Sequence, residues 1–151
     1  MNSISAKQIR ESVAHICKKY GDTYWRALDK EKKYPSEFVK EMTDSGFLNV
    51  LIPEEFGGSG LGLIDACAVL EEISLNGAHA GACHAQMYVM GSILRHGTEE
   101  QKAKYLPKIS AGKLRLQSFA VTEPNSGTDT TSIKTFAEKT NSGWKVNGQK
   151  V

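Results

Sequence analysis

A stretch near the carboxyl end of the sequence combines side chains and backbone suited to holding a ligand. Residues 119–129 read FAVTEPNSGTD. An alternating segment typical of a strand runs straight into a loop that contains proline, glycine and hydroxyl side chains. Hydroxyls and free backbone N–H groups donate hydrogen bonds to phosphate and carbonyl oxygens, and a glycine lets a ligand approach the backbone closely. The pattern is typical of a loop that holds a cofactor.

Two other interpretations of this loop compete with the first. Glu-Pro-Asn-Ser-Gly is favourable turn chemistry between two strands, with no ligand involved. Glu123 and Asp129 also suggest paired carboxylates for acid and base catalysis. We reject that pair because the turn has uses for both side chains, an aspartate being able to hydrogen-bond nearby backbone amides.

Two further patterns fail as binding sites. The glycine-rich residues 57–62 suggest a phosphate loop, but Leu63 stands where either common phosphate-binding motif would need glycine or lysine, so we expect a turn before a helix. His79, Cys83 and His84 have a spacing compatible with a metal pair. No further ligands cluster nearby, and a buried cysteine commonly acts as a small hydrophobic residue.

Composition describes an ordinary globular protein. The chain has 151 residues, 40% of them hydrophobic and 24% charged, with a formal net charge of +2. This length suffices for one good core, and the absence of a polybasic run argues against nucleic acid or an anionic membrane as the main partner. No apolar stretch reaches the length of a bilayer span and no secretory signal is apparent. Three widely spaced cysteines favour a reducing, cytoplasmic setting.

Helical periodicity dominates the first 110 residues. It predicts five helices, which run from Ser5 to Tyr20, Pro35 to Gly46, Leu63 to Ser74, Ala80 to Leu94 and Thr98 to about Ile109. A charged connector, residues 29–33, separates the first two.

Details of these segments predict their ends and surroundings. Ser5 with Gln8, and Thr98 with Gln101, have the spacing of a capping box. Pro107 removes a backbone donor and should bend or end the last helix.

Other segments are assigned by their apolar content. Residues 47–52 form a short apolar run that we expect to be extended. The helix from Ala80 to Leu94 is apolar or small almost all round, which predicts burial in the centre of a bundle. We interpret Trp25 and Trp144 as packing residues.

The period changes from about 3.6 to 2 after Lys113. It predicts a strand from Arg115 to Thr122, then a hairpin of residues 133–139 and 144–146 around a turn at 141–143. The fold class is therefore α+β, an amino-terminal all-helical bundle followed by the first antiparallel strands of a β domain.

Three motifs in a fixed order resemble the acyl-CoA dehydrogenase family. Residues 119–129 resemble its flavin-binding signature, with Thr128 where serine is usual. Residues 52–60, IPEEFGGSG, are similar to an early proline, acidic and glycine stretch. Residues 146–151, VNGQKV, resemble the segment that leads into an aromatic flavin-contacting motif.

The resemblance implies a fold and a reaction. Residues 1–113 would form the family's amino-terminal helical domain, and residues 114–151 the truncated start of its middle β domain. The reaction would be FAD-dependent α,β-dehydrogenation of an acyl-CoA thioester in fatty-acid metabolism. We expect this portion to be inactive alone, because the family supplies its catalytic glutamate from a carboxy-terminal helical domain. No catalytic residue and no metal ligand are assigned.

The resemblance also implies binding residues and partners. Phe119, Val121 and Thr122 would line the flavin of FAD, Gly127 would admit close approach, and Thr128 would contact the diphosphate or the acyl ligand. Implied partners are an acyl-CoA substrate, an electron-transfer flavoprotein or similar acceptor, and further copies in a homo-oligomer. Alternatives are a related flavin-dependent acyl-CoA oxidase or monooxygenase, and a truncated non-catalytic remnant.

Overall fold

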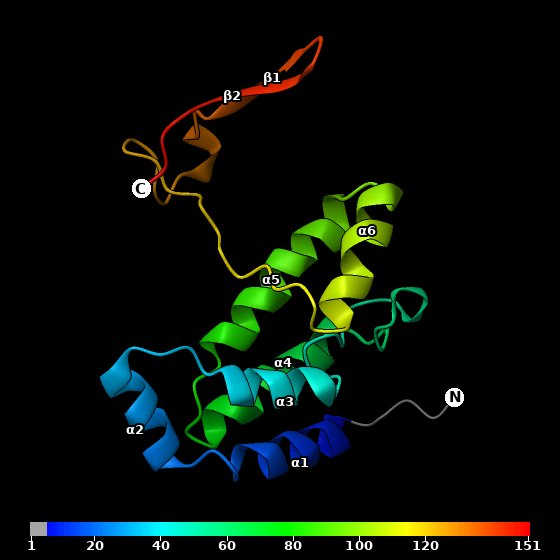
Figure 1. Cartoon of the computed structure of the whole chain (residues 1–151), viewed down its shortest axis with the longest axis vertical. Helices are drawn as coiled ribbons and strands as arrows, with labels where there is room; N and C mark the ends of the chain where they lie inside the picture. The colour runs from blue at the N-terminus through cyan, green and yellow to red at the C-terminus, as the bar shows by residue number, and fades with distance from the viewer. Residues whose placement is uncertain (1–5) are drawn as a thin grey trace. The chain divides into compact units, whose positions relative to one another are not determined.

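The computed structural model describes residues 6–151, which divide into two compact units between Gln117 and Ser118. Helices make up the first unit and a two-stranded antiparallel sheet belongs to the second (Figure 1). The predicted α+β class is therefore confirmed. The helices are α1 Ala6–Cys17, α2 Asp22–Glu31, α3 Ser36–Asp44, α4 Leu63–Leu75, α5 Gly81–His96 and α6 Glu99–Ser110, with short 3₁₀ turns η1 Glu54–Phe56 and η2 Thr130–Ser132.

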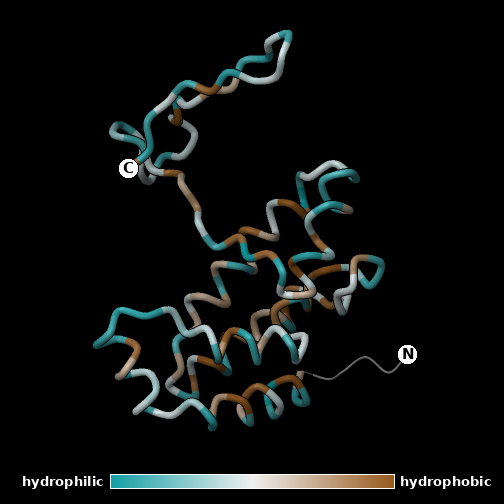
Figure 2. The backbone as a smooth tube through the Cα atoms, viewed as in Figure 1, coloured by the Kyte–Doolittle hydropathy of each residue, from teal (hydrophilic) through white to brown (hydrophobic). Residues whose placement is uncertain are grey.

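The core of the helical unit follows the spacing of its apolar residues. On α1, Ile9, Val13 and Ile16 are buried against α4, since residues three and four apart share one helix face. Figure 2 shows hydrophobic residues recurring along these helices. Phe38 of α3 is completely buried at the centre of the same core.

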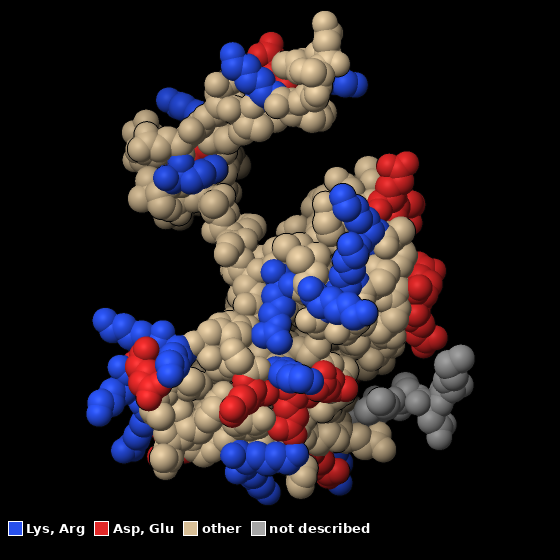
Figure 3. Space-filling model, in the orientation of Figure 1, with Lys and Arg blue, Asp and Glu red and all other residues tan. Residues whose placement is uncertain are grey.

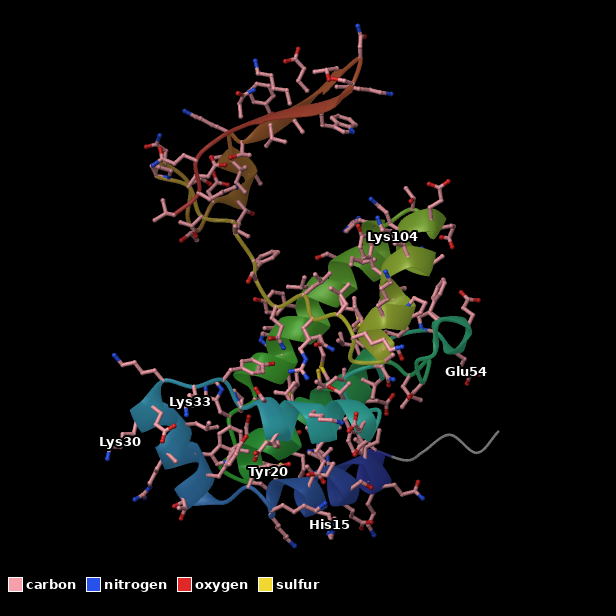
Figure 4. All side chains as sticks on the ribbon, viewed as in Figure 1. His15, Tyr20, Lys30, Lys33, Glu54 and Lys104 are labelled. Atoms are coloured by element: carbon pink, nitrogen blue, oxygen red, sulfur yellow. The ribbon has the colours of Figure 1, made fainter. Side chains whose placement is uncertain are left out.

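Helix α2 is a feature that periodicity missed. It has no fully buried residue, and part of the predicted charged connector belongs to it. The helix attaches through Trp25, whose ring centroid lies 5.1 Å from that of Phe38 and whose indole N–H donates to the Tyr20 carbonyl at 2.7 Å. Figure 4 labels Tyr20 at this junction and Lys30 and Lys33 at the outer end of α2. The packing role predicted for Trp25 is confirmed.

Helix ends agree in part with the capping predictions. Thr98 and Gln101 form the predicted capping box, with Thr98 N–H donating to the Gln101 side chain at 2.9 Å. The Ser5 and Gln8 box depends on Ser5, which lies outside the described residues. Helix α6 continues through Pro107 to Ser110, as far as the pattern predicted. Gly46, just beyond α3, has φ of 78°, which suits glycine best.

Two local predictions, for residues 47–52 and 115–122, are wrong. Residues 47–52 form consecutive turns with Leu48, Val50 and Ile52 buried, because apolar content decided burial and not backbone shape. Residues 115–122 do not form a strand. A strand needs a hydrogen-bonded neighbour, and in the described chain one backbone bond joins this segment to another, from Val151 N–H to the Thr122 carbonyl at 2.9 Å.

Helix α5 is less buried than its composition predicted. Cys83, Gln86, Met87 and Met90 are buried, but Tyr88 on another face is 39% exposed. Small or apolar residues on every face of a helix allow burial of all its faces, but each face is buried only if another element packs against it.

The hairpin of the second unit is confirmed, with strands β1 Phe136–Thr140 and β2 Gly143–Asn147. They pair antiparallel, with Ala137 opposite Val146 and Lys139 opposite Trp144. Every residue of both strands is exposed, and Figure 2 shows mostly hydrophilic residues there. Trp144 is 67% exposed, so the packing role predicted for it is wrong within the described residues.

A buried carboxylate holds the second unit together. Glu123 is 7% exposed, and it accepts hydrogen bonds from the N–H groups of Lys134 at 2.8 Å and Thr135 at 2.9 Å. The Lys150 ammonium donates to the same carboxylate at 3.0 Å. The Thr135 side chain beside it, these N–H groups and Lys150 lower the pKa of Glu123 to about 2. Glu123 thus joins three segments that are distant in sequence.

The Phe38 core gives the first prediction. Phe38→Ala should lower the free energy of unfolding of the helical unit by about 3–5 kcal/mol, because it removes a fully buried ring and leaves a cavity. Leu63→Ala is the matched control, since Leu63 is 71% exposed and its truncation should cost little. Urea unfolding followed by helical circular dichroism measures both, and equal losses would contradict the described core.

The second prediction concerns Glu123. Because its pKa is depressed, its stabilising contribution is complete above the pKa of an unfolded glutamate and is lost as the pH falls through about 2. At neutral pH, Glu123→Gln should speed hydrogen exchange at the Lys134 and Thr135 amides. Glu138→Gln, at an exposed position on β1, is the control. Unchanged exchange in Glu123→Gln would show that the carboxylate does not order the unit.

Candidate functional site

The loop that carries the predicted ligand contacts begins with a tight turn. Glu123 N–H donates to the Ser126 carbonyl at 2.9 Å, and Ser126 N–H donates back to the Glu123 carbonyl at 3.1 Å. Pro124 and Asn125 occupy the turn between them, as their types favour. The Ser126 hydroxyl donates to the Asp129 carbonyl at 2.6 Å, which joins the turn to the residues after it.

Asp129 closes the other end of the loop. Its carboxylate accepts from Thr131 N–H at 3.0 Å and from the Thr131 and Ser132 hydroxyls, and so caps η2. Hydrogen bonds lower the pKa of Asp129. The bond from the Ser132 hydroxyl has the largest effect, followed by those from the hydroxyl and N–H of Thr131. The expected bond from aspartate to a backbone amide is confirmed.

Neither loop carboxylate is suited to remove a proton. A general base works best when its pKa lies near the working pH, whereas hydrogen bonds lower the pKa of both Glu123 and Asp129. Both side chains instead fix the backbone between them. This arrangement agrees with the rejection of the paired-carboxylate hypothesis.

Three of the predicted contact residues, Thr122, Gly127 and Thr128, have open donors at or beside this turn. Thr122, Gly127 and Thr128 are exposed, Val121 is half-buried, and Phe119 is 62% exposed. Among the described residues, the hydroxyls of Thr122 and Thr128 and the N–H groups of Thr122 and Gly127 have no hydrogen-bond partner.

The chemistry of these donors fits a flavin nucleotide. Hydroxyl and amide donors match the carbonyl oxygens of a flavin pyrimidine edge and the oxygens of a diphosphate, and the apolar side chains match the flat ring. A Cβ added at Gly127 would meet no atom within 4 Å, so the backbone there is open on the side-chain face. The residues present are thus compatible with FAD.

Lys150 is a residue of this region that the sequence analysis did not single out. Its ammonium donates to the Val121 carbonyl at 2.9 Å as well as to Glu123. A lysine 27 positions after a glutamate carries no local pattern, so the contact becomes visible only when the chain end returns to the loop. Gly148 permits this return of the chain, since a Cβ there would lie 2.0 Å from the Thr135 hydroxyl oxygen.

The glycine-rich residues 57–62 are not arranged as a phosphate loop. The N–H groups of Gly58 and Gly60 donate to the carbonyls of Pro53 and Ile52, at 3.2 and 2.8 Å. A Cβ added at Gly58 would lie 2.0 Å from the Ile52 oxygen. These glycines serve close packing of the chain on itself, and their amides are already used.

No metal centre is found in the described part of the chain. Residues 6–151 contain no group of three or more histidine, cysteine, aspartate or glutamate side chains placed to hold a metal ion. Cys83 is completely buried in the helical core, and burial raises its pKa to about 12. It acts as a small hydrophobic residue, as expected. None of the helices within this range is both long and apolar enough to cross a membrane.

Charge on the surface is mixed. Figure 3 shows both acidic and basic side chains on the visible face of the helical unit. Ion pairs on this surface include exposed ones, such as Arg26 with Asp22 at 3.6 Å, and exposed pairs contribute little to stability. In the second unit, the Lys150 side chain is 29% exposed and pairs with Glu123 at 3.0 Å.

Comparison with known proteins places these features in a family. Residues 4–113 match the model of the acyl-CoA dehydrogenase amino-terminal domain. Acyl-CoA dehydrogenase FadE12 of Mycobacterium tuberculosis is 36% identical over 154 residues, which cover 100% of this chain and 39% of that protein. Curated relatives are longer, and the chain spans 36–39% of the length of the first of them.

Solved structures agree in fold. The crystal structure of an acyl-CoA dehydrogenase complexed with FAD from Bacillus anthracis has a TM-score of 0.84 at 31% identity, covering 98% of this chain and 26% of that one. The prolyl acyl carrier protein oxidase AnaB has a TM-score of 0.81 at 27% identity, covering 99% of this chain and 40% of that one. Because the family model matches residues 4–113, which are most of the sequence, the chain belongs to the acyl-CoA dehydrogenase family.

Proposed function

We propose that this chain contributes to FAD-dependent α,β-dehydrogenation of an acyl-CoA thioester. The observation that carries the proposal is the set of open donors on a fixed loop, at Thr122, Gly127 and Thr128. Open, oriented donors favour a ligand rich in acceptors, because binding then costs little reorganisation. Family membership supplies the class of ligand.

Each loop residue has a role in this proposal. Phe119 and Val121 present apolar surface to the flavin ring, and Thr122 offers its hydroxyl and N–H to the pyrimidine edge. Gly127 allows close approach, and Thr128 donates to the diphosphate or to the acyl ligand. When bound, FAD supplies the acceptor for the hydrogen that leaves the β carbon of the acyl group.

Removal of the α proton requires a base from outside the described loop. Glu123 and Asp129 have lowered pKa values and their oxygens are occupied by hydrogen bonds. We infer that a glutamate performs this step. Enzymes of the family supply this glutamate from a carboxy-terminal helical domain. Residues 1–113 and 114–151 would then be the helical domain and the start of the middle β domain of a longer enzyme.

Partners and location extend the same proposal. Phe136, Trp144 and Val146 are all more than half exposed on the hairpin, which favours cover by further chain or by another copy in a homo-oligomer. An electron-transfer flavoprotein or similar acceptor would reoxidise the flavin. Cys17, Cys67 and Cys83 are free thiols, which supports a reducing compartment such as the cytoplasm.

A second candidate is a flavin-dependent oxidase. The likeness to AnaB, a prolyl acyl carrier protein oxidase, favours it, because that protein shares the fold over nearly the whole of this chain. The two reactions use the same cofactor and differ in whether oxygen reoxidises the reduced flavin. Rapid oxidation of the reduced enzyme by dissolved oxygen would favour the oxidase.

The third prediction tests the loop. Thr122→Val replaces an open hydroxyl with a methyl, so the affinity for FAD should fall by at least about fivefold, since one lost hydrogen bond that leaves its partner unsatisfied costs roughly 1–3 kcal/mol. Titration with quenching of flavin fluorescence measures the dissociation constant. Thr140→Val, at an exposed position on β1, is the control and should bind normally. Equal affinity of Thr122→Val and the parent would remove Thr122 from the site.

The fourth prediction concerns the base. The 151-residue chain loaded with FAD should not bleach when mixed with acyl-CoA thioesters, because neither loop carboxylate can take the α proton. Absorbance near the flavin maximum, with dithionite reduction as a positive control, gives the readout. Bleaching by acyl-CoA would mean that a base is present within these residues.

A further inference from the structure

The Lys150 ammonium and the open Thr122 amide lie on opposite ends of one peptide group. Lys150 Nζ donates to the Val121 carbonyl oxygen at 2.9 Å, and that carbonyl belongs to the same peptide unit as Thr122 N–H. None of the peptide bonds in the described chain is cis. In a trans peptide the C=O and N–H bonds point in opposite directions, so Thr122 N–H points away from Lys150.

The peptide unit is also held in place on its other sides. Glu123 accepts from Lys150 at 3.0 Å, which fixes the ammonium, and Glu123 itself is tied to Lys134 and Thr135. Val151 N–H donates to the Thr122 carbonyl at 2.9 Å. The peptide units before and after Thr122 are thus both anchored by the same returning segment.

We propose that Lys150 is a positioning residue, which orients and polarises Thr122 N–H toward an electron-rich acceptor. The inference rests on the proposed function, in which that acceptor is a carbonyl of the flavin pyrimidine edge. A cation on a carbonyl oxygen draws electron density from the peptide and makes its N–H a stronger donor, as in cooperative hydrogen-bonded chains. Lys150 therefore acts on the ligand through the backbone without touching it.

The arrangement favours a reduced flavin over an oxidised one. Reduction adds electron density to the pyrimidine edge, and a stronger donor gains more from a more negative acceptor. Loss of the Lys150 charge should weaken binding of reduced FAD more than binding of oxidised FAD. A tenfold difference between these two losses corresponds to a reduction potential lower by about 30 mV for a two-electron couple.

Two variants separate charge from shape. Lys150→Met keeps an unbranched side chain but removes the ammonium, and Lys150→Arg keeps the positive charge. Lys145→Met on β2, opposite Glu138, removes a lysine of the same unit that does not contact the loop. The NMR amide signals of Ala137 and Val146, which are paired across the hairpin, report whether it remains folded in each variant.

The first measurement needs no flavin. In the FAD-free chain, Lys150→Met should shift the NMR resonance of the Thr122 amide proton upfield. Base-catalysed exchange of this proton with solvent should also slow, because the N–H becomes less acidic. Lys150→Arg and Lys145→Met should retain the parent values. A Thr122 amide unchanged in Lys150→Met with the hairpin intact would overturn the inference. If Lys150→Met unfolds the hairpin, Lys150→Arg decides, and a folded Lys150→Arg with an altered Thr122 amide would also overturn it.

The second measurement uses the FAD-loaded protein. The potential of bound FAD should be lower in Lys150→Met than in the parent and restored in Lys150→Arg. An equal potential in all three would overturn the inference, since a purely structural lysine would alter retention of FAD without this dependence on charge. Failure of the parent to bind FAD would overturn the proposed function instead, and the Thr122 amide measurement would still test the polarisation.

Discussion

The described geometry of residues 118–151 depends on a carboxylate with little contact with solvent. Glu123 meets two backbone N–H groups from the segment before β1 and an ammonium from the segment after β2. A two-stranded hairpin with all its residues exposed has no core of its own and is marginal in water. The carboxylate replaces a missing core with charge-assisted hydrogen bonds, which are about twice as strong as neutral ones. The loop is consequently placed by electrostatics more than by packing.

The helical unit is organised on the opposite principle. Its buried side chains are almost all apolar. The aromatic rings of Tyr20, Trp25 and Phe38 join the connection between α1 and α2 to helices α2 and α3 in edge-to-face contacts. Such contacts tolerate small changes of side chain if volume is kept. The helical unit is therefore held together mainly by apolar and aromatic packing, whereas the loop of the second unit is held by polar contacts.

Much of this arrangement could be predicted from sequence, for identifiable reasons. The helices with one buried stripe, such as α1, α3 and α4, were found because burial on one face imposes a 3.6-residue period. Helix α2 was missed because it attaches through Trp25 and Tyr24 and buries no complete stripe. The hairpin was found because Asn-Ser-Gly is strong turn chemistry between alternating residues. The strand at 115–122 was wrong because alternation reports two faces but cannot supply a partner.

The candidate loop shows the same division. Its turn, its aspartate cap and its open hydroxyls follow from residue types at short spacing. The pairing of Glu123 with Lys150 does not, since it joins positions 27 residues apart and depends on the path of the chain between them. Contacts between residues close in sequence can be predicted from residue types. The long-range contacts that fix the position of the loop depend on tertiary structure.

The contact between Glu123 and Lys150 depends on glycine at position 148. Any side chain there would meet the Thr135 hydroxyl at 2.0 Å and the other Thr135 side-chain atoms within 2.7 Å. The returning segment would have to shift, and with it the lysine two residues later. In the proposed complex with FAD, a substitution at Gly148 would therefore alter the reduction potential of the flavin without touching it. The lack of a side chain at Gly148 thus helps to keep the Lys150 charge against the Val121 carbonyl.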